Sequence, residues 1–270
     1  IASPGRSYEA VFPAMALSER PRPASDGKSL DSLYFSAFRT VLERFGCSRE
    51  GRTRTSTPGE RAWSHPVVTD PFRPFLQRRG AAVLDGGLAT ELEARGLVID
   101  NVLWSARALI DAPAIVAAVH RDYLEAGADV IETATYQATL QGLTAQGLSA
   151  RDAGHVLRSG VTLACRQRDA FWERHEPNGH RARPLVAASI GSYGAFLADG
   201  SEYRGGYGQD QDALAAWHRP RLRLLEESGA DLLAFETIPS LVEAEAIVGL
   251  LGETDGPPAW LSFQAGSAQS

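Results

Sequence analysis

Two stretches of the sequence end an apolar run on a side chain that can bind a cation or transfer a proton. In "VLDGG" (83–87) Asp85 precedes two glycines, and in "LLAFET" (232–237) Glu236 follows four apolar residues. An unpaired charge at the end of a buried strand is costly, so Glu236 needs several hydrogen-bond donors or a cationic partner. That partner is either an arginine of the protein or the ammonium group of a ligand, and the sequence leaves both open. Asp85 either binds a ligand or only holds the turn after its strand.

Polar groups that follow other apolar runs belong to the same prediction. They are Gly86 and Gly87, Thr133 to Gln137, which include Thr135, and Ser189 to Tyr193. Glycine lets backbone N–H groups come close to an anion, and a threonine hydroxyl can donate or accept a hydrogen bond. A tight turn and ordinary strand-end polarity are the structural alternatives. If the runs are neighbouring parallel strands, their ends place carboxylates, hydroxyls and glycine amides around one ligand site.

The elements that would position these groups are strands that alternate with helices. Apolar residues at helical spacing predict helices at 112–128, 149–175, 210–230 and 240–252. Short apolar runs predict strands at 81–86, 129–135, 185–191, 231–237 and 259–264. Because most of these runs are apolar throughout, they are typical of a parallel sheet that helices cover.

A repeated phrase indicates how the units follow one another. "EAGADVIETATY" (125–136) and "ESGADLLAFETI" (227–238) each read as a helix end, a Gly-Ala-Asp turn and a strand that closes on polar residues. Repetition of an αβ unit favours a (β/α)8 TIM barrel, of which the chain supplies about the first five βα units. The glycine-rich loop, 189–208, is long for a strand-to-helix connection. It is either a loop that covers the ligand site or a merely flexible surface loop.

Composition and charge narrow the class of protein. The chain has 270 residues, of which 44% are hydrophobic and 22% charged, and a net charge of −6. These values are typical of a globular protein and give no reason to expect nucleic acid or a membrane as a partner. Cys47 and Cys165 make neither a disulfide framework nor a zinc site, so we expect a cytoplasmic protein and no metal ligands. Three histidines in predicted helices are more typical of surface or core residues than of ligands: His120, His155 and His218.

Three segments differ in character along the chain. Residues 1–68 are rich in Pro, Ser, Arg and Gly, apart from a predicted helix at 30–46. We interpret them as a low-order leader that need not be native, with a functional arm as the alternative. Residues 69–264 carry the strands and helices of the partial barrel. Residues 265–270 form an atypical tail.

Several segments together resemble the homocysteine S-methyltransferase family over about residues 69–263. They are "VLDGGLATELEARG" (83–96), "LWSARALIDAP" (103–113), "TATYQAT" (133–139), "GSYGAFLADGSEYRGGY" (191–207), "HRPR" (218–221) and "ADLLAFETIP" (230–239). Within the family, the chain is most similar to enzymes that use S-methylmethionine as the methyl donor. The resemblance implies a (β/α)8 barrel, in agreement with the predicted strands.

The resemblance also implies an activity and a set of site residues. The family transfers a methyl group to the sulfur of homocysteine, which gives methionine, and a zinc ion binds that sulfur as the thiolate. The resemblance places Glu236 on the α-ammonium group of the substrate. It places Asp85, Gly86 and Thr135 around the amino-acid end. The small-molecule partners are therefore homocysteine and a methyl donor.

One departure from the family pattern affects the expected activity. No cysteine of this chain falls at a position of the family's zinc ligands, so we expect zinc ligands and catalytic residues to be absent. We accordingly expect a C-terminally truncated or frame-disrupted chain with impaired methyl transfer. Two alternatives stay open, a non-catalytic amino-acid-binding fragment and a non-functional product. The sequence predicts neither the methyl donor with certainty nor the oligomeric state.

Overall fold

A computed structural model describes residues 70–98, 105–175 and 181–264. Contacts divide the chain into two units, 1–73 and 74–270, and the fold described below is that of the second unit. The predicted helix at 30–46 and the tail at 265–270 lie outside the described residues. Among the described helices, none has the length and apolar character needed to cross a membrane.

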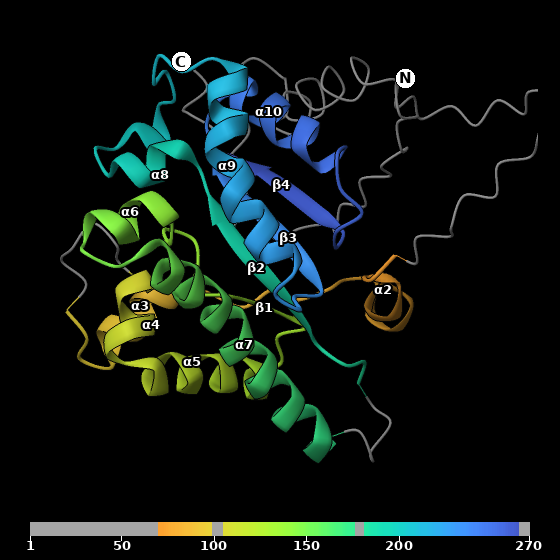
Figure 1. Ribbon diagram of the computed structural model, residues 1–270. Helices are drawn as coiled ribbons and strands as arrows, with labels where there is room; N and C mark the ends of the chain where they lie inside the picture. The colour runs from red at the N-terminus through yellow and green to blue at the C-terminus, as the bar shows by residue number, and fades with distance from the viewer. Residues whose placement is uncertain (1–69, 99–104, 176–180, 265–270) are drawn as a thin grey trace, which may run out of the picture. The chain divides into compact units, whose positions relative to one another are not determined.

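Helices alternate with strands along the described part of the second unit, and four strands form one sheet (Figure 1). The strands are β1 (Val130–Glu132), β2 (Leu185–Gly191), β3 (Leu232–Ile238) and β4 (Ala259–Phe263). The helices are α2 (Arg73–Arg79), α3 (Leu88–Ala94), α4 (Ser105–Asp111), α5 (Pro113–Ala126), α6 (Leu140–Ala145), α7 (Ala150–His175), α8 (Tyr193–Leu197), the 3-10 helix η2 (Ser201–Tyr203), α9 (Gln211–Glu226) and α10 (Leu241–Leu251).

The sheet has the strand order β1-β2-β3-β4, and every neighbouring pair of strands is parallel. This confirms the predicted α/β fold with a parallel sheet. In the register, Glu132 lies beside Ala187, and Glu236 lies beside Gly191. Because successive side chains of a strand point to opposite faces, Glu132, Ser189 and Glu236 share one face of the sheet.

The predicted strand at 81–86 is the main difference from the expected elements. Only Leu84 pairs with Val130, as an isolated parallel bridge. The amide of Asp85 still donates to the carbonyl of Val130 at 3.0 Å, so the segment follows β1 as predicted. The pairing stops early because Gly87 already lies at the N-cap of α3 and directs the chain away from the sheet.

The two Gly-Ala-Asp turns begin their strands in the same way. Asp129 accepts a hydrogen bond from the amide of Val83 at 2.9 Å, and Asp231 accepts one from the amide of Val186 at 2.8 Å. Each aspartate also pairs with an arginine side chain. The repeated phrase in the sequence therefore has the same structural role at both places. An aspartate at the start of one strand binds the backbone at the start of the adjacent strand segment.

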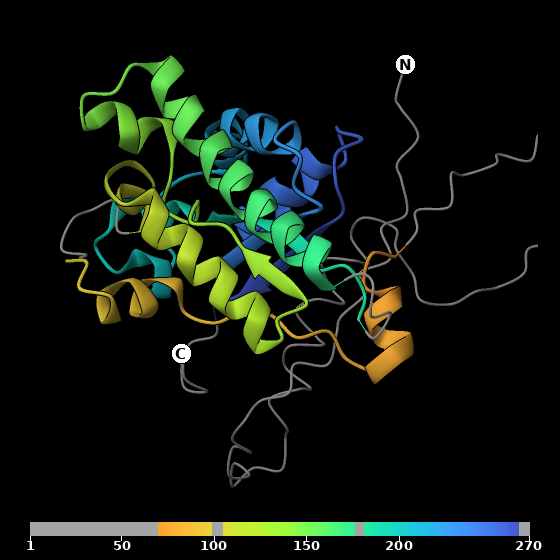
Figure 2. The same ribbon diagram turned by 90° about the horizontal axis from the view of Figure 1, so that it is seen from below.

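Helices α7, α9 and α10 cover one face of the sheet, and α5 runs beside α7 (Figures 1 and 2). Ser149 caps the N-terminus of α7, since the amide of Asp152 donates to Ser149 Oγ at 3.1 Å. The core between the helices and the sheet contains Ile131, Val186, Ile190, Leu233, Phe235, Leu157, Val161, Ala164, Leu222, Leu225, Ile247 and Leu250. The strand side chains on the face covered by the helices thus form the core. Glu132, Ser189 and Glu236 lie on the opposite face of the sheet.

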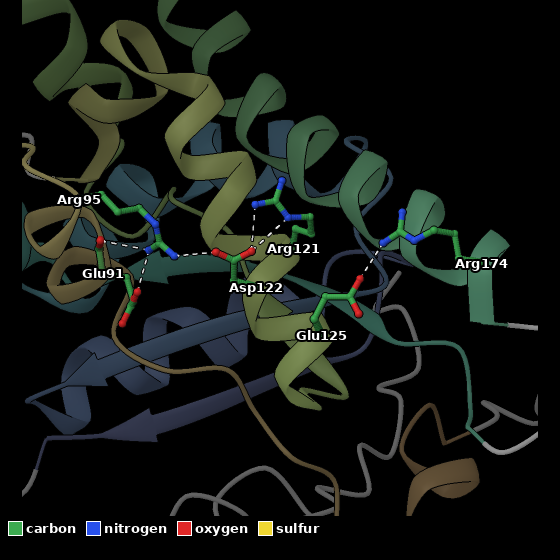
Figure 3. Close-up of polar contacts among 6 residues, drawn as sticks. All are labelled: Glu91, Arg95, Arg121, Asp122, Glu125 and Arg174. Atoms are coloured by element: carbon green, nitrogen blue, oxygen red, sulfur yellow. Dashed lines mark hydrogen bonds and ion pairs between the residues drawn. The ribbon is translucent and has the colours of Figure 1, made fainter.

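Polar contacts on the surface join α3, α5 and α7 (Figure 3). Arg95 donates to Glu91 at 2.7 Å and to Asp122 at 2.8 Å, which links the end of α3 to α5. Arg174 of α7 donates to Glu125 of α5 at 2.8 Å. Exposed ion pairs of this kind contribute little free energy each, so the buried core and not this surface network holds the helices in place.

Candidate ligand site at the carboxyl ends of the strands

Three carboxylates lie together at the carboxyl ends of the strands, and we call Asp85, Glu132 and Glu236 the carboxylate cluster. Asp85 Oδ2 accepts a hydrogen bond from the backbone amide of Glu132 at 2.9 Å. The side chains of Glu132 and Glu236 are hydrogen-bonded to each other. All three are partly buried. The sequence predicted Asp85 and Glu236 as neighbours in one site, but it did not single out Glu132.

Glu236 has a partner on the adjacent strand. Ser189 Oγ of β2 donates to Glu236 Oε2 at 2.5 Å. Within 70–98, 105–175 and 181–264, no arginine, lysine or histidine forms an ion pair with Glu236. The internal ion pair, one of the two explanations left open by the sequence, is therefore not present in this part of the chain.

Burial raises the pKa of each carboxyl of the cluster, and the charges of neighbouring carboxylates add to this shift for Asp85 and Glu132. Burial raises the pKa of Asp85 to about 7; the amide of Glu132 opposes this shift, and the charge of Glu236 adds to it. Burial, followed by the charges of Glu236 and Asp85, raises the pKa of Glu132 well above its usual range. Burial also raises the pKa of Glu236, which the hydrogen bonds from Ser189 and Glu132 counteract. A hydrogen bond between the carboxyl groups of Glu132 and Glu236 requires one proton, which the two residues share as a pair.

A positive charge would relieve this arrangement. Two acids that share a proton, with a third close by, lose their repulsion when a cation arrives. The cluster can then ionise further and release protons to solvent. The chemistry of the site is therefore that of binding a cationic group and not that of donating to an anion.

The other two predicted site residues lie beside the cluster in different ways. Thr135 is fully buried, and its hydroxyl donates to the carbonyl of Ser189 at 2.7 Å and contacts Thr133 Oγ1 at 2.6 Å. It therefore supports the strand segment that carries Ser189. Gly86 is exposed, and a Cβ there would lie 2.8 Å from the hydroxyl of Tyr123, so only glycine fits without displacing that ring.

Thr237, directly after Glu236, has a backbone conformation that is rare for its residue type. Its φ is 58°, in the left-handed region, where a β-branched side chain is an outlier. The pairing of β3 with β4 is irregular at this point, between Phe235 and Ile238. Strained residues of this kind are common at ligand sites, and Thr237 directly follows Glu236, the acidic residue of β3.

Replacing Thr237 by asparagine is expected to stabilise the fold by about 0.5–1 kcal/mol, because asparagine adopts left-handed backbone at lower cost. Thr237→Val is the control, since valine keeps the β-branched shape and the strain. The free energy of unfolding, measured with denaturant, should be higher for asparagine than for valine. An equal or lower value for asparagine would show that the strain is not stored at this residue.

The glycine-rich loop connects the end of β2 with the start of α9. It contains α8 and η2, and Gly194, Ala195 and Ser201 are buried, so it is not merely a flexible surface loop. A Cβ on Gly205 would lie 3.2 Å from the carbonyl oxygen of Pro239, which places this part of the loop against the chain that leaves β3. The loop therefore borders the two strands that supply Ser189 and Glu236.

The fold is that of a parallel α/β protein, and the carboxylate cluster is a candidate ligand site at the strand ends. A family model described as homocysteine S-methyltransferase matches residues 82–269. The chain therefore belongs to the homocysteine S-methyltransferase family, which confirms the resemblance seen in the sequence.

Individual relatives agree with this assignment. Homocysteine S-methyltransferase YbgG of Bacillus subtilis (strain 168) is 48% identical over 196 residues, which cover 73% of this chain and 62% of the relative. Homocysteine S-methyltransferase 1 of Arabidopsis thaliana is 52% identical over 189 residues, 68% of this chain and 58% of the relative. The chain thus spans about three fifths of the length of these relatives.

A solved structure has the same fold over the shared part. The metallated form of the homocysteine methyltransferase MmuM from Escherichia coli superposes with a TM-score of 0.68 at 44% identity. The match covers 72% of this chain and 66% of that chain. A selenocysteine Se-methyltransferase of Brassica oleracea var. italica is also similar, at 48% identity over 194 residues, 69% of this chain and 56% of the relative.

Proposed function

We propose that the carboxylate cluster binds the α-ammonium group of homocysteine, and that the chain contributes this site to the transfer of a methyl group to the homocysteine sulfur. The observation that carries the proposal is the buried, proton-sharing pair of Glu132 and Glu236 without a basic partner in the described part of the chain. An ammonium group supplies the missing positive charge. Membership of the homocysteine S-methyltransferase family supports homocysteine as the amino acid that carries this ammonium group.

The proposal gives each residue of the site one role. Glu236 binds the ammonium group, with Asp85 as the second acceptor, and the amide of the Gly86 turn faces the amino-acid end. Ser189 orients the Glu236 carboxylate by its hydrogen bond. Thr135 acts one step further away, by holding the carbonyl of Ser189. The sheet itself is proposed to be part of a (β/α)8 barrel, as in the family.

The proposed reaction moves one methyl group between two sulfur atoms. The thiol of homocysteine loses its proton, its sulfur forms a bond to the methyl carbon, and the donor's carbon–sulfur bond breaks. With S-methylmethionine as the donor, its sulfonium becomes a neutral thioether, so that both products are methionine. The residues described above hold the amino-acid end of homocysteine during this exchange and do not touch the reacting sulfur.

A metal ion does not fit the described residues. Among them, no group of three or more His, Cys, Asp or Glu side chains is arranged to hold one. Cys165 lies in α7, where its thiol contacts the carbonyl of Gly229 at 3.5 Å, and Cys47 lies outside the described residues. No step of the proposed chemistry is therefore assigned to zinc, and binding of homocysteine without turnover is the second candidate function.

Calorimetry with the full chain tests the proposal. Homocysteine is expected to bind with release of protons, so that the apparent enthalpy at pH 7 changes with the ionisation enthalpy of the buffer. Butyric acid derivatives without an amino group serve as the control and should not bind. Absence of homocysteine binding would contradict the proposal. A parallel assay for methionine formation from homocysteine and S-methylmethionine, with and without added zinc, separates the enzyme from the binding protein.

A further inference from the structure

A second group of buried polar side chains lies beside the glycine-rich loop and takes no part in the proposed binding. His218 and Arg221 of α9 are 1% and 2% exposed, and Glu243 of α10 is fully buried. Charged side chains are rarely buried to this extent unless they are paired and fully hydrogen-bonded. We call these three residues the buried triad.

Glu243 contacts the glycine-rich loop at two places. Its Oε1 accepts hydrogen bonds from the backbone amide of Tyr193 at 2.6 Å and from His218 Nε2 at 2.9 Å. Its Oε2 accepts one from the hydroxyl of Tyr207 at 2.7 Å. Tyr193 lies near the start of the loop and Tyr207 near its end, so one carboxylate joins both ends of the loop to α10.

Arg221 holds the backbone on the other side of the same segment. It donates to the carbonyl of Gly191 at 2.5 Å and to the carbonyl of Tyr136 at 3.3 Å. The carbonyl of Gly191 is thus bound by a cation, and the amide of Tyr193 by an anion. Gly191 is fixed further by its surroundings, since a Cβ there would lie 2.7 Å from the carbonyl oxygen of Tyr136.

His218 connects the two charges. Its Nε2 donates to Glu243, and its Nδ1 lies 3.4 Å from an Arg221 nitrogen, from which it can accept. This arrangement requires a neutral imidazole with the proton on Nε2. Burial lowers the pKa of His218 to about 4, while Glu243 acts to raise it and Arg221 to lower it, so the neutral form is present at neutral pH. Every donor and acceptor of the ring is thereby used.

We propose that His218, Arg221 and Glu243 are positioning residues that hold the glycine-rich loop against the end of β2 and so keep Ser189 aligned with Glu236. Ser189 lies two residues before Gly191, on the face of β2 that carries the site. None of the three residues touches the carboxylate cluster among the contacts of the described chain, so they act through the loop. The effect on the loop is independent of the ligand, whereas the effect on affinity depends on the proposed function.

Hydrogen exchange of the full chain tests the effect on the loop. Glu243→Gln is expected to speed exchange in peptides from 191–208 about tenfold, because the two donors from the loop, the Tyr193 amide and the Tyr207 hydroxyl, lose their charged acceptor. Tyr207→Phe removes a single hydroxyl and should speed exchange near 201–208 by a smaller factor, with the melting temperature retained. Exchange in α5 and α7 should not change in either variant. If Glu243→Gln does not fold, Tyr207→Phe decides the question.

A matched control uses the same two helices. Arg219 of α9 pairs with Glu253, which follows α10, on the exposed surface. Glu253→Gln breaks this pair without reaching the loop, and exchange in 191–208 should remain as in the unmodified chain. Equal loop exchange in Tyr207→Phe, Glu243→Gln and Glu253→Gln would overturn the proposal.

Homocysteine affinity provides the second readout. Glu243→Gln should raise the dissociation constant about tenfold, and Glu253→Gln should leave it unchanged. Faster loop exchange without a change in affinity would overturn the link to Ser189 and Glu236. If the unmodified chain binds no homocysteine, the proposed function fails, and the exchange experiment still decides whether the buried triad holds the loop.

Discussion

Glu236→Gln is expected to weaken homocysteine binding about 100-fold, which corresponds to about 3 kcal/mol. Glutamine keeps the size of the side chain and an oxygen that can accept from Ser189. It removes the charge that the ammonium group requires, and a ligand cation would then be buried beside an uncharged amide. The dissociation constant from calorimetry at pH 7 measures this effect.

The same experiment reports on the shared proton. Because the pKa values of all three carboxyl groups of the cluster are raised, the unmodified chain should release protons when the ammonium group binds, and Glu236→Gln should release fewer. Glu173→Gln is the matched control, since Glu173 is exposed on α7 and loses the same charge. Affinity in Glu236→Gln within about twofold of the control would show that another group binds the ammonium.

His120→Leu is expected to make the fold less sensitive to acid by about 2–3 kcal/mol between pH 7 and pH 4.5. His120 is fully buried in α5, and its ring nitrogens have no hydrogen-bond partner among the residues that the structure describes. Burial lowers its pKa to about 4 from an ordinary value of 6.5. Between these values the unfolded chain binds a proton that the folded chain does not, so stability falls as pH decreases from 6.5 towards 4.

The comparison of variants isolates this contribution. Asp85 and Glu132 act in the opposite sense, because their raised pKa values stabilise the folded chain at low pH and this stability is lost as pH rises. They are present in both proteins, so their effect cancels in the difference. Leucine also removes two unpaired polar atoms from the core, and a gain in stability at pH 7 is expected as well.

Denaturant unfolding at several pH values measures the difference. His155→Leu serves as the control, because His155 is exposed on α7. The unmodified chain and the His155 variant should lose stability in parallel below pH 6.5. A His120 variant that follows the same curve would show that the imidazole is hydrated or paired in the folded protein.

The fold could be predicted from local patterns to a large extent. Uninterrupted apolar runs predicted β2 and β3 within a residue of their ends, because both strands are buried on both faces. The strand predicted at 81–86 was too long, since the glycines after Asp85 end the pairing with β1. The point where pairing ends depends on where α3 begins. The sequence motifs were also enough to identify the family. Each motif belongs to a different turn of the backbone, so the motifs are specific when taken together.

The sequence alone determined that an acid would end β3 and that Asp85 would lie near it, since strand ends meet at one edge of a parallel sheet. Only the tertiary structure decided that Glu132 joins them, that the Thr135 hydroxyl is used inside the protein, and that Glu243 binds both ends of the glycine-rich loop. The physical reason is that these contacts join residues far apart in the chain. Their existence depends on strand register and helix packing, which no local pattern of residues specifies.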